Sequence, residues 1–299
     1  MKMRDDSAPS AGGAVCERAW AKVNLLLSVG RLREDGYHDL VSVMQTVSFG
    51  DTVRLSAADS GGVTLQCAGV EVPCGAENLA VKAANTFFDK TGTSLPGLRI
   101  TLEKAIPTQA GLGGGSADAA AVLRGLRRIC APDLPYSALE EMGMALGSDV
   151  PFCVRGGSAK VLGKGEVVLP LAPLPRAWFV LVKPDEAYST AAMYQRIDKE
   201  CLWESGDSVA LENALRSGDL AGICRLMHNT FERCLPPDSQ APLIVRRLRA
   251  LGADGAMLSG SGSAVFGVFS DELTAHAALT VLHHTYPNTF LATPVQRVE

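Results

Sequence analysis

A run of glycines is the most distinctive chemical feature of this sequence. Gly111, Gly113, Gly114 and Gly115 fall within five consecutive positions, and strong helix formers fill the following residues up to 130. Glycine costs backbone entropy in a strand or helix without contributing packing, so the run predicts a loop. Ser116 is the predicted N-cap of the helix that follows. The sequence therefore predicts a glycine loop that leads directly into a helix N-terminus.

Such a junction is suited to binding phosphate. It gathers unpaired N–H groups at the positive end of a helix dipole, and it has no side chains to keep an anion at a distance. A Walker A loop is excluded, because Gly115-Ser116-Ala117 contains no lysine. A dinucleotide fingerprint would need glycine or alanine where Ser116 stands. A flexible linker would not start a well-formed helix.

Two further places carry polar groups in apolar surroundings. Lys22 and Asn24 share one face of a predicted strand over residues 15–29, because strand side chains alternate. Either they point into a site, or Lys22 extends its ammonium out from an apolar face. Asp149 stands between a glycine and a Val-Pro-Phe run, where it either caps a neighbouring segment or acts in chemistry. The residues alone leave both questions open.

Two shorter motifs complete the set. Tyr37 and His38 follow a charged turn, and such a pair is often only structural. A second glycine segment, Ser259-Gly260-Ser261-Gly262-Ser263, interrupts a predicted strand. This segment is either the turn of a hairpin or a second part of the same site.

The order of elements indicates how these residues are positioned. Antiparallel-looking strands and clustered helices alternate along the chain without an internal repeat, which favours an α+β fold. A single helix is predicted over residues 220–234 and a last strand over 290–298. The two prolines of Ala172-Pro173-Leu174-Pro175 mark a linker. The predicted divisions are an irregular tail at 1–14, one domain at 15–172 and a second at 173–299.

Composition excludes several classes of protein. The chain has 299 residues, of which 47% are hydrophobic, and a net charge of −4, with no basic surface pattern suited to nucleic acid. Its eight cysteines form no C-x-x-C pair, so neither a zinc site nor a disulfide framework is expected. The chain shows no signal peptide and no apolar run long enough to span a membrane. These features predict a cytoplasmic globular protein, and they leave its oligomeric state open.

The motifs together resemble those of a known superfamily. Four motifs are similar to those of the galactokinase, homoserine kinase, mevalonate kinase and phosphomevalonate kinase (GHMP) superfamily. They are the glycine loop with its Ser-x-Asp-Ala-Ala continuation, the Ala-Lys-Val-Asn-Leu strand, Gly-Ser-Asp-Val-Pro-Phe and Ser-Gly-Ser-Gly-Ser. The Asp-Gly-Tyr-His turn that ends at His38 narrows the resemblance to the 4-diphosphocytidyl-2-C-methyl-D-erythritol kinases of the non-mevalonate isoprenoid pathway. The motifs occur in the family's order and span roughly residues 20–269.

The resemblance implies a two-domain fold, with an N-terminal mixed β-sheet domain and a ferredoxin-like C-terminal domain. It implies ATP and Mg²⁺ as cofactors, and phosphorylation of the 2-hydroxyl of the diphosphocytidyl sugar alcohol. The triphosphate would lie along Pro107, Thr108, Gln109, Ala110, Gly111, Leu112, Gly113, Gly114, Gly115, Ser116 and Ala117. Relatives often carry smaller residues than Thr108 and Gln109, which alters loop stiffness and removes no donor.

The remaining roles are also implied by the resemblance. Asn78 and Lys104 match positions near the nucleotide, and Ser116 matches one near the magnesium ion. The catalytic pair corresponds to Lys22 and Asp149. The diphosphocytidyl group would be held by residues that match Asn24, Tyr37, His38 and Tyr194, with Tyr188 as the rival for the aromatic ring over cytosine. The alternatives are a homoserine or mevalonate kinase and a non-catalytic ligand sensor on the same fold.

Overall fold

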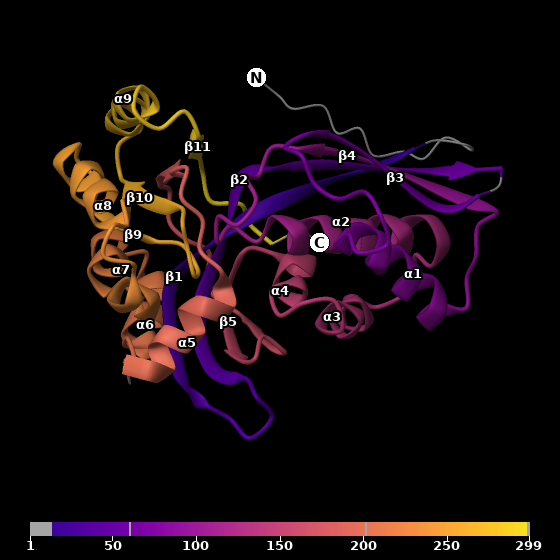
Figure 1. The fold of residues 1–299 in the computed structure, drawn as a ribbon, viewed down its shortest axis with the longest axis horizontal. Coiled ribbons are helices and arrows are strands. Elements are labelled where there is room, and N and C mark those ends of the chain that lie inside the picture. Colours follow the sequence, from indigo (N-terminus) through magenta and orange to yellow (C-terminus); the bar gives the residue numbers. More distant parts are fainter. Residues whose placement is uncertain (1–13, 60, 201, 298–299) are drawn as a thin grey trace.

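A computed structural model describes residues 14–59, 61–200 and 202–297 of the chain. The tail predicted at residues 1–14 lies outside the described residues, except for Ala14. Figure 1 shows a mixed sheet with helices on one side of it, and beside it a second sheet with its own helices. The predicted α+β class is confirmed.

The N-terminal part is built on a seven-stranded mixed sheet. The path β3-β4-β2-β1-β8 runs through it, β5 pairs with β2, and β6 pairs with β5. The pairs β3–β4 and β1–β8 are parallel and the others antiparallel. The strands are β1 Val15–Leu32, β2 His38–Ala58, β3 Gly62–Gly69, β4 Gly97–Lys104, β5 Ser158–Gly163, β6 Val167–Pro170 and β8 His228–Asn229.

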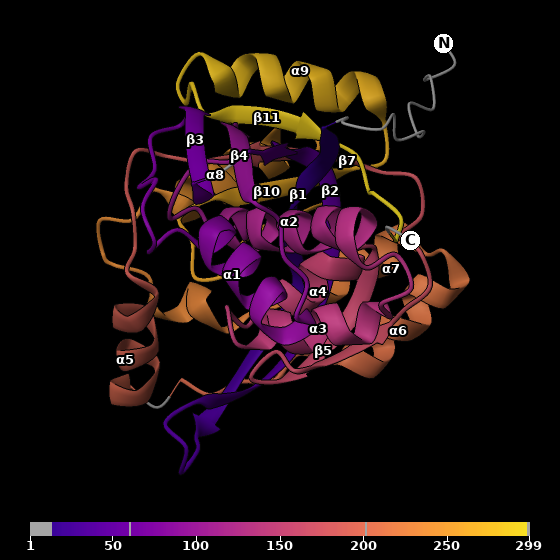
Figure 2. The same ribbon diagram turned by 90° about the vertical axis from the view of Figure 1, so that its right-hand side faces the viewer.

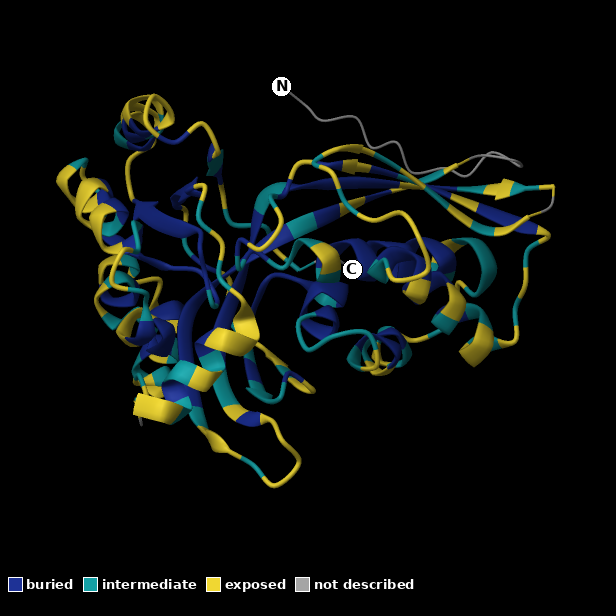
Figure 3. Cartoon of the chain, in the orientation of Figure 1, coloured by how far each residue is buried: buried dark blue, intermediate teal, exposed yellow. Residues whose placement is uncertain are grey.

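Helices cover one face of this sheet (Figures 1 and 2). They are α1 Leu79–Thr91, α2 Gly114–Cys130, α3 Tyr136–Met144 and α4 Val150–Arg155. Apolar side chains of α1, α2 and α4 pack on those of β2 and β4 in one continuous cluster that includes Phe87, Ile100 and Phe152. Figure 3 shows α2 as largely buried. This packing fixes the direction in which the N-terminus of α2 points.

The C-terminal sheet has the strand order of a ferredoxin-like fold. Its order β11-β7-β10-β9 is antiparallel throughout, which places the first strand of the unit between the fourth and the third. The predicted ferredoxin-like domain is therefore confirmed. The strands are β7 Trp178–Val182, β9 Gly255–Leu258, β10 Val265–Phe269 and β11 Thr289–Ala292. The helices are α5 Thr190–Glu200, α6 Ser208–Ser217, α7 Leu220–Leu226, η1 Thr230–Cys234, α8 Ala241–Ala250 and α9 Glu272–His283.

Two predicted elements are wrong. The single helix expected over residues 220–234 breaks at Met227, because His228 and Asn229 pair in parallel with Leu26 and Leu27 of β1. The side chain of Asn229 also donates to the carbonyls of Leu258 and Gly260, and these long-range bonds outweigh local helix propensity. The last strand ends at Ala292 rather than continuing to 298, which lies outside the described residues.

The two units share a buried core. Val23 and Leu25 of β1 pack with Phe179 and Leu181 of β7 and with Phe266 of β10 in one apolar cluster. The strand that carries Lys22 is therefore anchored against the second unit. None of the helices in the described part of the chain is long and apolar enough to cross a membrane.

Candidate active site

The glycine loop lies between the end of β4 and the start of α2. The helix begins at Gly114, and Gly113, with φ of 72°, takes the N-cap position. The predicted N-cap Ser116 is thus wrong: Ser116 lies inside the first turn, and its hydroxyl makes no capping bond. Asp118 lies beyond the first turn and is 3% exposed. A glycine can take this cap because it adopts a left-handed conformation without strain.

The loop is polarised along its backbone. The carbonyls of five consecutive residues, 109–113, all accept hydrogen bonds, including bonds from Lys22 N, Ser263 N and Ala264 N. By contrast, within the described part of the chain no amide of residues 108–116 donates a bond to a protein acceptor. Buried or partly buried amides normally find a partner. The loop therefore presents free donors on one side while its acceptors are held from the other.

The second glycine segment, with Ala264 directly after it, donates to three of those carbonyls. Residues 259–263 connect the antiparallel strands β9 and β10, so the hairpin interpretation is correct. The segment also packs directly on the first loop, where Ser259 Oγ donates to Gly111 O at 3.0 Å. A Cβ atom on Gly111 would meet Ser259 O at 2.0 Å, so only glycine fits there. The segment is thus a hairpin turn that also packs against the glycine loop.

Lys22 and Asp149 meet beside the glycine loop. Lys22 Nζ lies 3.4 Å from Asp149 Oδ2, and their side chains are 5% and 30% exposed. The stem of Lys22 runs along the loop, since a Cβ atom on Gly113 would lie 3.0 Å from Lys22 Cγ. Asp149 occupies the N-cap position of α4, yet its side chain makes no capping bond. The ammonium of Lys22 is therefore buried rather than extended into solvent, and the carboxylate of Asp149 is not used as a cap.

Asn24 orients the ammonium group. Its Oδ1 accepts from Lys22 Nζ at 2.8 Å, and its Nδ2 donates to Ser42 Oγ at 2.9 Å. Ser42 in turn donates to the carbonyl of Leu26. Lys22, Asn24 and Ser42 are all buried. A chain of hydrogen bonds thus fixes where Lys22 can place its charge.

Lys22 and Asp149 line a cavity of about 670 Å³, called here the Asp149 cavity. Tyr37, His38 and Tyr194 line the same cavity, as do Ser116 and Gly260. The rings of His38 and Tyr194 stack with centroids 4.9 Å apart and planes inclined by 22°. Tyr188 does not line it, because its ring packs near Gly262 and its hydroxyl bonds to Ser239. Tyr194 is therefore better placed than Tyr188 to face a ligand.

Reasoning from the sequence missed two charged residues of the Asp149 cavity. Asp198 on α5 lies with Oδ2 3.4 Å from His38 Nε2. Lys164, in the turn between β5 and β6, places Nζ 4.7 Å from the ring centre of Tyr37. In the sequence, the glycines on either side of it, Gly163 and Gly165, indicate only the turn of a hairpin. No local signal connects either residue with Tyr37 or His38.

A second cavity of about 280 Å³, called here the Asn78 cavity, lies on the other side of the glycine loop. Residues 106–115 of the loop line it together with Asn78, Leu79, Lys104 and Asp118. Asn78 caps α1, where its Oδ1 accepts from Ala80 N at 2.9 Å. Ala117 is buried in the core and lines neither cavity. The glycine loop thus separates the two cavities.

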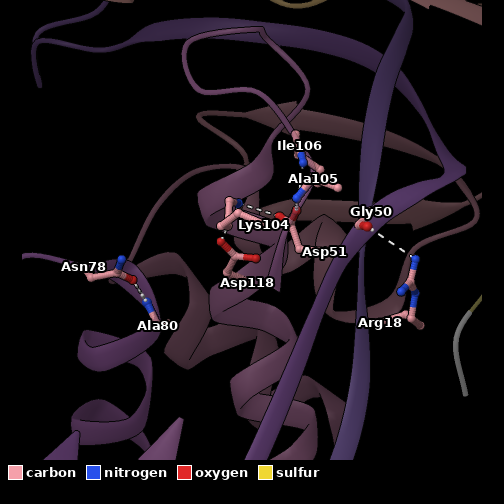
Figure 4. Close-up of polar contacts among 9 residues, drawn as sticks. All are labelled: Arg18, Gly50, Asp51, Asn78, Ala80, Lys104, Ala105, Ile106 and Asp118. Carbon is pink, nitrogen blue, oxygen red and sulfur yellow. Dashed lines mark hydrogen bonds and ion pairs between the residues drawn. The ribbon is translucent and has the colours of Figure 1, made fainter. Parts of the chain in front are cut away.

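Lys104 is more deeply engaged than its predicted role suggests. Figure 4 shows its ammonium between two carboxylates, 2.5 Å from Asp51 Oδ2 and 2.8 Å from Asp118 Oδ2. Burial lowers the pKa of Lys104, but the two carboxylates outweigh it and leave that pKa raised. Burial raises the pKa of Asp118 to about 7, against the opposing charge of Lys104. One ammonium cannot fully compensate two buried carboxylates.

The oxygen ligands that the protein offers suit a magnesium ion that is bound mainly by phosphate oxygens. Ser116 and Asp149 offer oxygen ligands within the Asp149 cavity. No group of three or more His, Cys, Asp or Glu side chains among the described residues could hold a metal ion alone. Mg²⁺ commonly binds one or two protein oxygens together with substrate phosphates and water. The site therefore fits Mg²⁺ that arrives with a nucleotide.

Comparison with known proteins identifies the family. The model of the GHMP kinases N terminal domain matches residues 78–157, and that of the GHMP kinases C terminal domain matches residues 211–288. The 4-diphosphocytidyl-2-C-methyl-D-erythritol kinase of Moorella thermoacetica is 44% identical over 91% of this chain and 96% of its own length. The chain belongs to this kinase family. The Gloeobacter violaceus member is 43% identical over 89% of each chain.

Solved structures agree with membership of the 4-diphosphocytidyl-2-C-methyl-D-erythritol kinase family. A crystal structure of 4-(cytidine 5'-diphospho)-2C-methyl-D-erythritol kinase has a TM-score of 0.78 at 35% identity, covering 94% of this chain and 99% of the other. Mevalonate kinase from L. major has a TM-score of 0.75 at 20% identity, over 95% and 96%, which shows the shared fold. As a family member, the chain is an ATP-dependent kinase of a small molecule. The predicted family and enzyme class are confirmed.

Proposed function

We propose that this chain transfers the γ-phosphoryl group of ATP to the 2-hydroxyl of 4-diphosphocytidyl-2-C-methyl-D-erythritol, a step of the non-mevalonate isoprenoid pathway. One observation carries the proposal. The Lys22–Asp149 pair lies in the same cavity as the stacked rings of His38 and Tyr194, beside a loop of free amides. The names and close identity of the relatives support the same substrate.

The polarised loop supports an assignment of the two cavities. Free amides of residues 108–116 and the positive end of α2 favour the β- and γ-phosphates of ATP. The remainder of the nucleotide would then occupy the Asn78 cavity, and the alcohol the Asp149 cavity. Magnesium, held by the phosphates with Ser116 nearby, would supply positive charge at the transferring group. Phosphoryl transfer mainly requires that the partners are held in line and that negative charge is neutralised.

Lys22 and Asp149 divide the remaining work. The ammonium of Lys22, oriented by Asn24 and Ser42, would contact the transferring phosphoryl group and the attacking oxygen. Asp149, whose side chain is the more exposed of the pair, would accept the proton of the alcohol. An ordinary carboxylate is a weak base for an alcohol, so we expect proton transfer to follow bond formation.

The His38 ring supports recognition of cytosine. His38 Nδ1 lies 2.8 Å from the carbonyl of Gly30, and since a carbonyl can only accept, Nδ1 carries the proton. Nε2 lies 3.4 Å from Asp198 Oδ2, so in the neutral ring these two atoms form a pair of acceptors to which the cytosine amino group can donate both of its N–H bonds. The ring of Tyr194, or that of the more exposed Tyr37, can stack on the base. Homoserine and mevalonate offer no ring for such a surface.

A coupled ADP-release assay tests the proposal. The chain is supplied with ATP and Mg²⁺ and with the diphosphocytidyl alcohol, mevalonate or homoserine in parallel reactions. We expect turnover with the first alcohol alone. Turnover with mevalonate or homoserine instead would contradict the proposal and indicate another GHMP kinase activity. No turnover with any of the three alcohols would favour a non-catalytic ligand sensor.

A further inference from the structure

Asp51, Lys104 and Asp118 form a buried ion cluster directly beneath the glycine loop (Figure 4). Their side chains are 0%, 3% and 5% exposed. They come from three elements that are distant in sequence, namely β2, the end of β4 and α2. A Cβ atom on Gly114, the first residue of α2, would lie 3.3 Å from Lys104 Nζ. The cluster therefore touches the backbone that carries the free amides.

Asp51 holds the chain where it enters the loop. Its Oδ1 accepts from the amides of Ala105 and Ile106, and its Oδ2 pairs with Lys104 Nζ. These contacts fix the backbone immediately before Pro107. Hydrogen bonds to an ionised acceptor are stronger than neutral ones. The entrance of the loop is thus set by one carboxylate of β2.

Asp118 holds the chain where it leaves the loop. Its Oδ2 accepts from Lys104 Nζ at 2.8 Å, which joins α2 to the end of β4. The two ends of the loop are thereby connected through a single ammonium. Between them Gln109, Gly111 and Gly113 all have positive φ, so the loop has little regular structure of its own. Its shape therefore depends on where its ends are held as well as on the hydrogen bonds that its carbonyls accept.

The cluster is a costly means of packing. It contains two carboxylates for one ammonium, and among the residues that the structure describes Asp118 Oδ1 is buried without a hydrogen-bond partner. Buried ion pairs are often no more stabilising than apolar residues of similar volume, and they are best explained where they specify a geometry. Stability alone therefore gives no reason for three ionisable groups at this place.

We propose that Asp51 and Asp118 are positioning residues for phosphoryl transfer, which act through Lys104 to hold the two ends of the glycine loop at the spacing that aligns its amides on the nucleotide. The inference rests on the proposed assignment of the loop to ATP, and it does not depend on which alcohol is the acceptor. It gives Lys104 a role in shaping the loop.

The test compares Asp118→Asn and Asp51→Asn with Glu17→Gln in the full chain. Glu17 on β1 is a matched control, because its buried carboxylate pairs at 3.2 Å with Arg124, which belongs to the same helix α2. This ion pair lies away from the glycine loop. We expect both Asp variants to raise the Kd for ADP and the KM for ATP about tenfold or more, as small displacements of positioning groups do. The KM for the alcohol should stay within about twofold, the scatter expected without a lost contact.

Glu17→Gln separates positioning from stability. It should lower the melting temperature and leave the Kd for ADP unchanged. The triple variant Asp51→Asn, Lys104→Met and Asp118→Leu removes all three charges of the cluster, and we expect weak ADP binding from it even when it is folded. A folded Asp118→Asn or triple variant with wild-type affinity for ADP would overturn the inference, as would an equal loss in Glu17→Gln. Because ADP is titrated without any alcohol, a negative substrate assay leaves this result interpretable.

Discussion

Lys22 Nζ lies 3.4 Å from Asp149 Oδ2, although one residue belongs to the first strand of the chain and the other begins helix α4. The ammonium is buried and tied to Asn24, whereas the carboxylate is more open to the Asp149 cavity. The pair thus presents a fixed positive charge next to an accessible base. Its position beside the free amides of the glycine loop explains why the proposed chemistry belongs here.

Replacing the base should abolish turnover without abolishing binding. We expect Asp149→Asn to reduce kcat by about 10²-fold or more, because a carboxamide cannot take the proton of the alcohol. The affinity for ADP, measured by titration, should remain close to that of the wild type, since Asp149 lines the Asp149 cavity and not the Asn78 cavity. Near-normal turnover in this variant would remove Asp149 from the mechanism.

Residues of the aromatic wall should affect one substrate only. Tyr194→Ala should raise the KM for the diphosphocytidyl alcohol by about tenfold, because base stacking is worth roughly 1–3 kcal/mol. Tyr194→Phe is the control, since it keeps the ring. His38→Ala should also raise this KM, and the KM for ATP should not change in any of the three. Steady-state kinetics with each substrate varied in turn decides, and equal effects on both KM values would assign these side chains elsewhere.

Gln109 offers a test that is free of folding effects. It is the sole non-glycine with positive φ in the described ranges, and it lines both cavities. Gln109→Gly relieves a left-handed strain of about 1–2 kcal/mol and adds about 0.5–1 kcal/mol of backbone entropy cost, so the melting temperature should hardly fall.

If the carboxamide of Gln109 contacts the phosphates, kcat/KM should drop by about tenfold or more in Gln109→Gly. Asparagine tolerates the same backbone conformation and keeps an amide on a shorter side chain. The kcat/KM of Gln109→Asn should therefore lie between those of the wild type and Gln109→Gly. Kinetics and thermal melting of the three proteins provide the comparison. Full activity in Gln109→Gly would show that the backbone alone serves the loop.

Glu232 should make stability depend on pH. Burial raises the pKa of Glu232, although Leu258 N donates to its carboxylate at 2.9 Å. A carboxyl group whose pKa is raised by folding contributes most stability below its unfolded pKa, near 4.5, and loses it as the pH rises through the folded pKa. Relative to Glu232→Gln, the wild type should therefore become less stable as the pH rises above about 4.5.

Urea unfolding at a series of pH values measures this difference for Glu232. The glutamine side chain keeps an oxygen that can accept from the backbone N–H of Leu258, the residue directly before the second glycine segment. The comparison therefore isolates the effect of the carboxylate charge on stability. A stability difference that is independent of pH, or one that moves in favour of the wild type, would contradict the expectation.

Local patterns were sufficient for several features. The loop predicted from the glycine run is correct for Gly111 to Gly113, whereas Gly114 and Gly115 already belong to α2. The helix-forming residues after them predict α2 to its end at Cys130. Asn78 caps α1, in agreement with the capping preference of asparagine. The placing of Lys22 and Asn24 on one strand face follows from the period of two. Their roles in catalysis and binding remain predictions.

Long-range contacts overruled local patterns elsewhere. Ser116 is a better N-cap than glycine by propensity, yet Gly113 caps α2, because the backbone there takes a φ of 72° that favours glycine and lies close to the stem of Lys22. The helix predicted through residues 227–229 gives way to a strand, because Asn229 completes the edge of β1. Neither competing interaction is visible in the segment that it changes.

The sequence by itself determined the glycine loop, the helix after it, the α+β class and the family, because backbone entropy, residue periodicity and motif order are local properties. The resemblance implied Lys22 and Asp149 as a pair, and the tertiary structure sets their charged atoms 3.4 Å apart. Only the tertiary structure engaged Lys104 between Asp51 and Asp118 and placed Lys164 and Asp198 in the Asp149 cavity. The physical reason is that such contacts depend on how separate elements pack. A side chain's partner is set by the shared core of the two units and not by its neighbours in the chain.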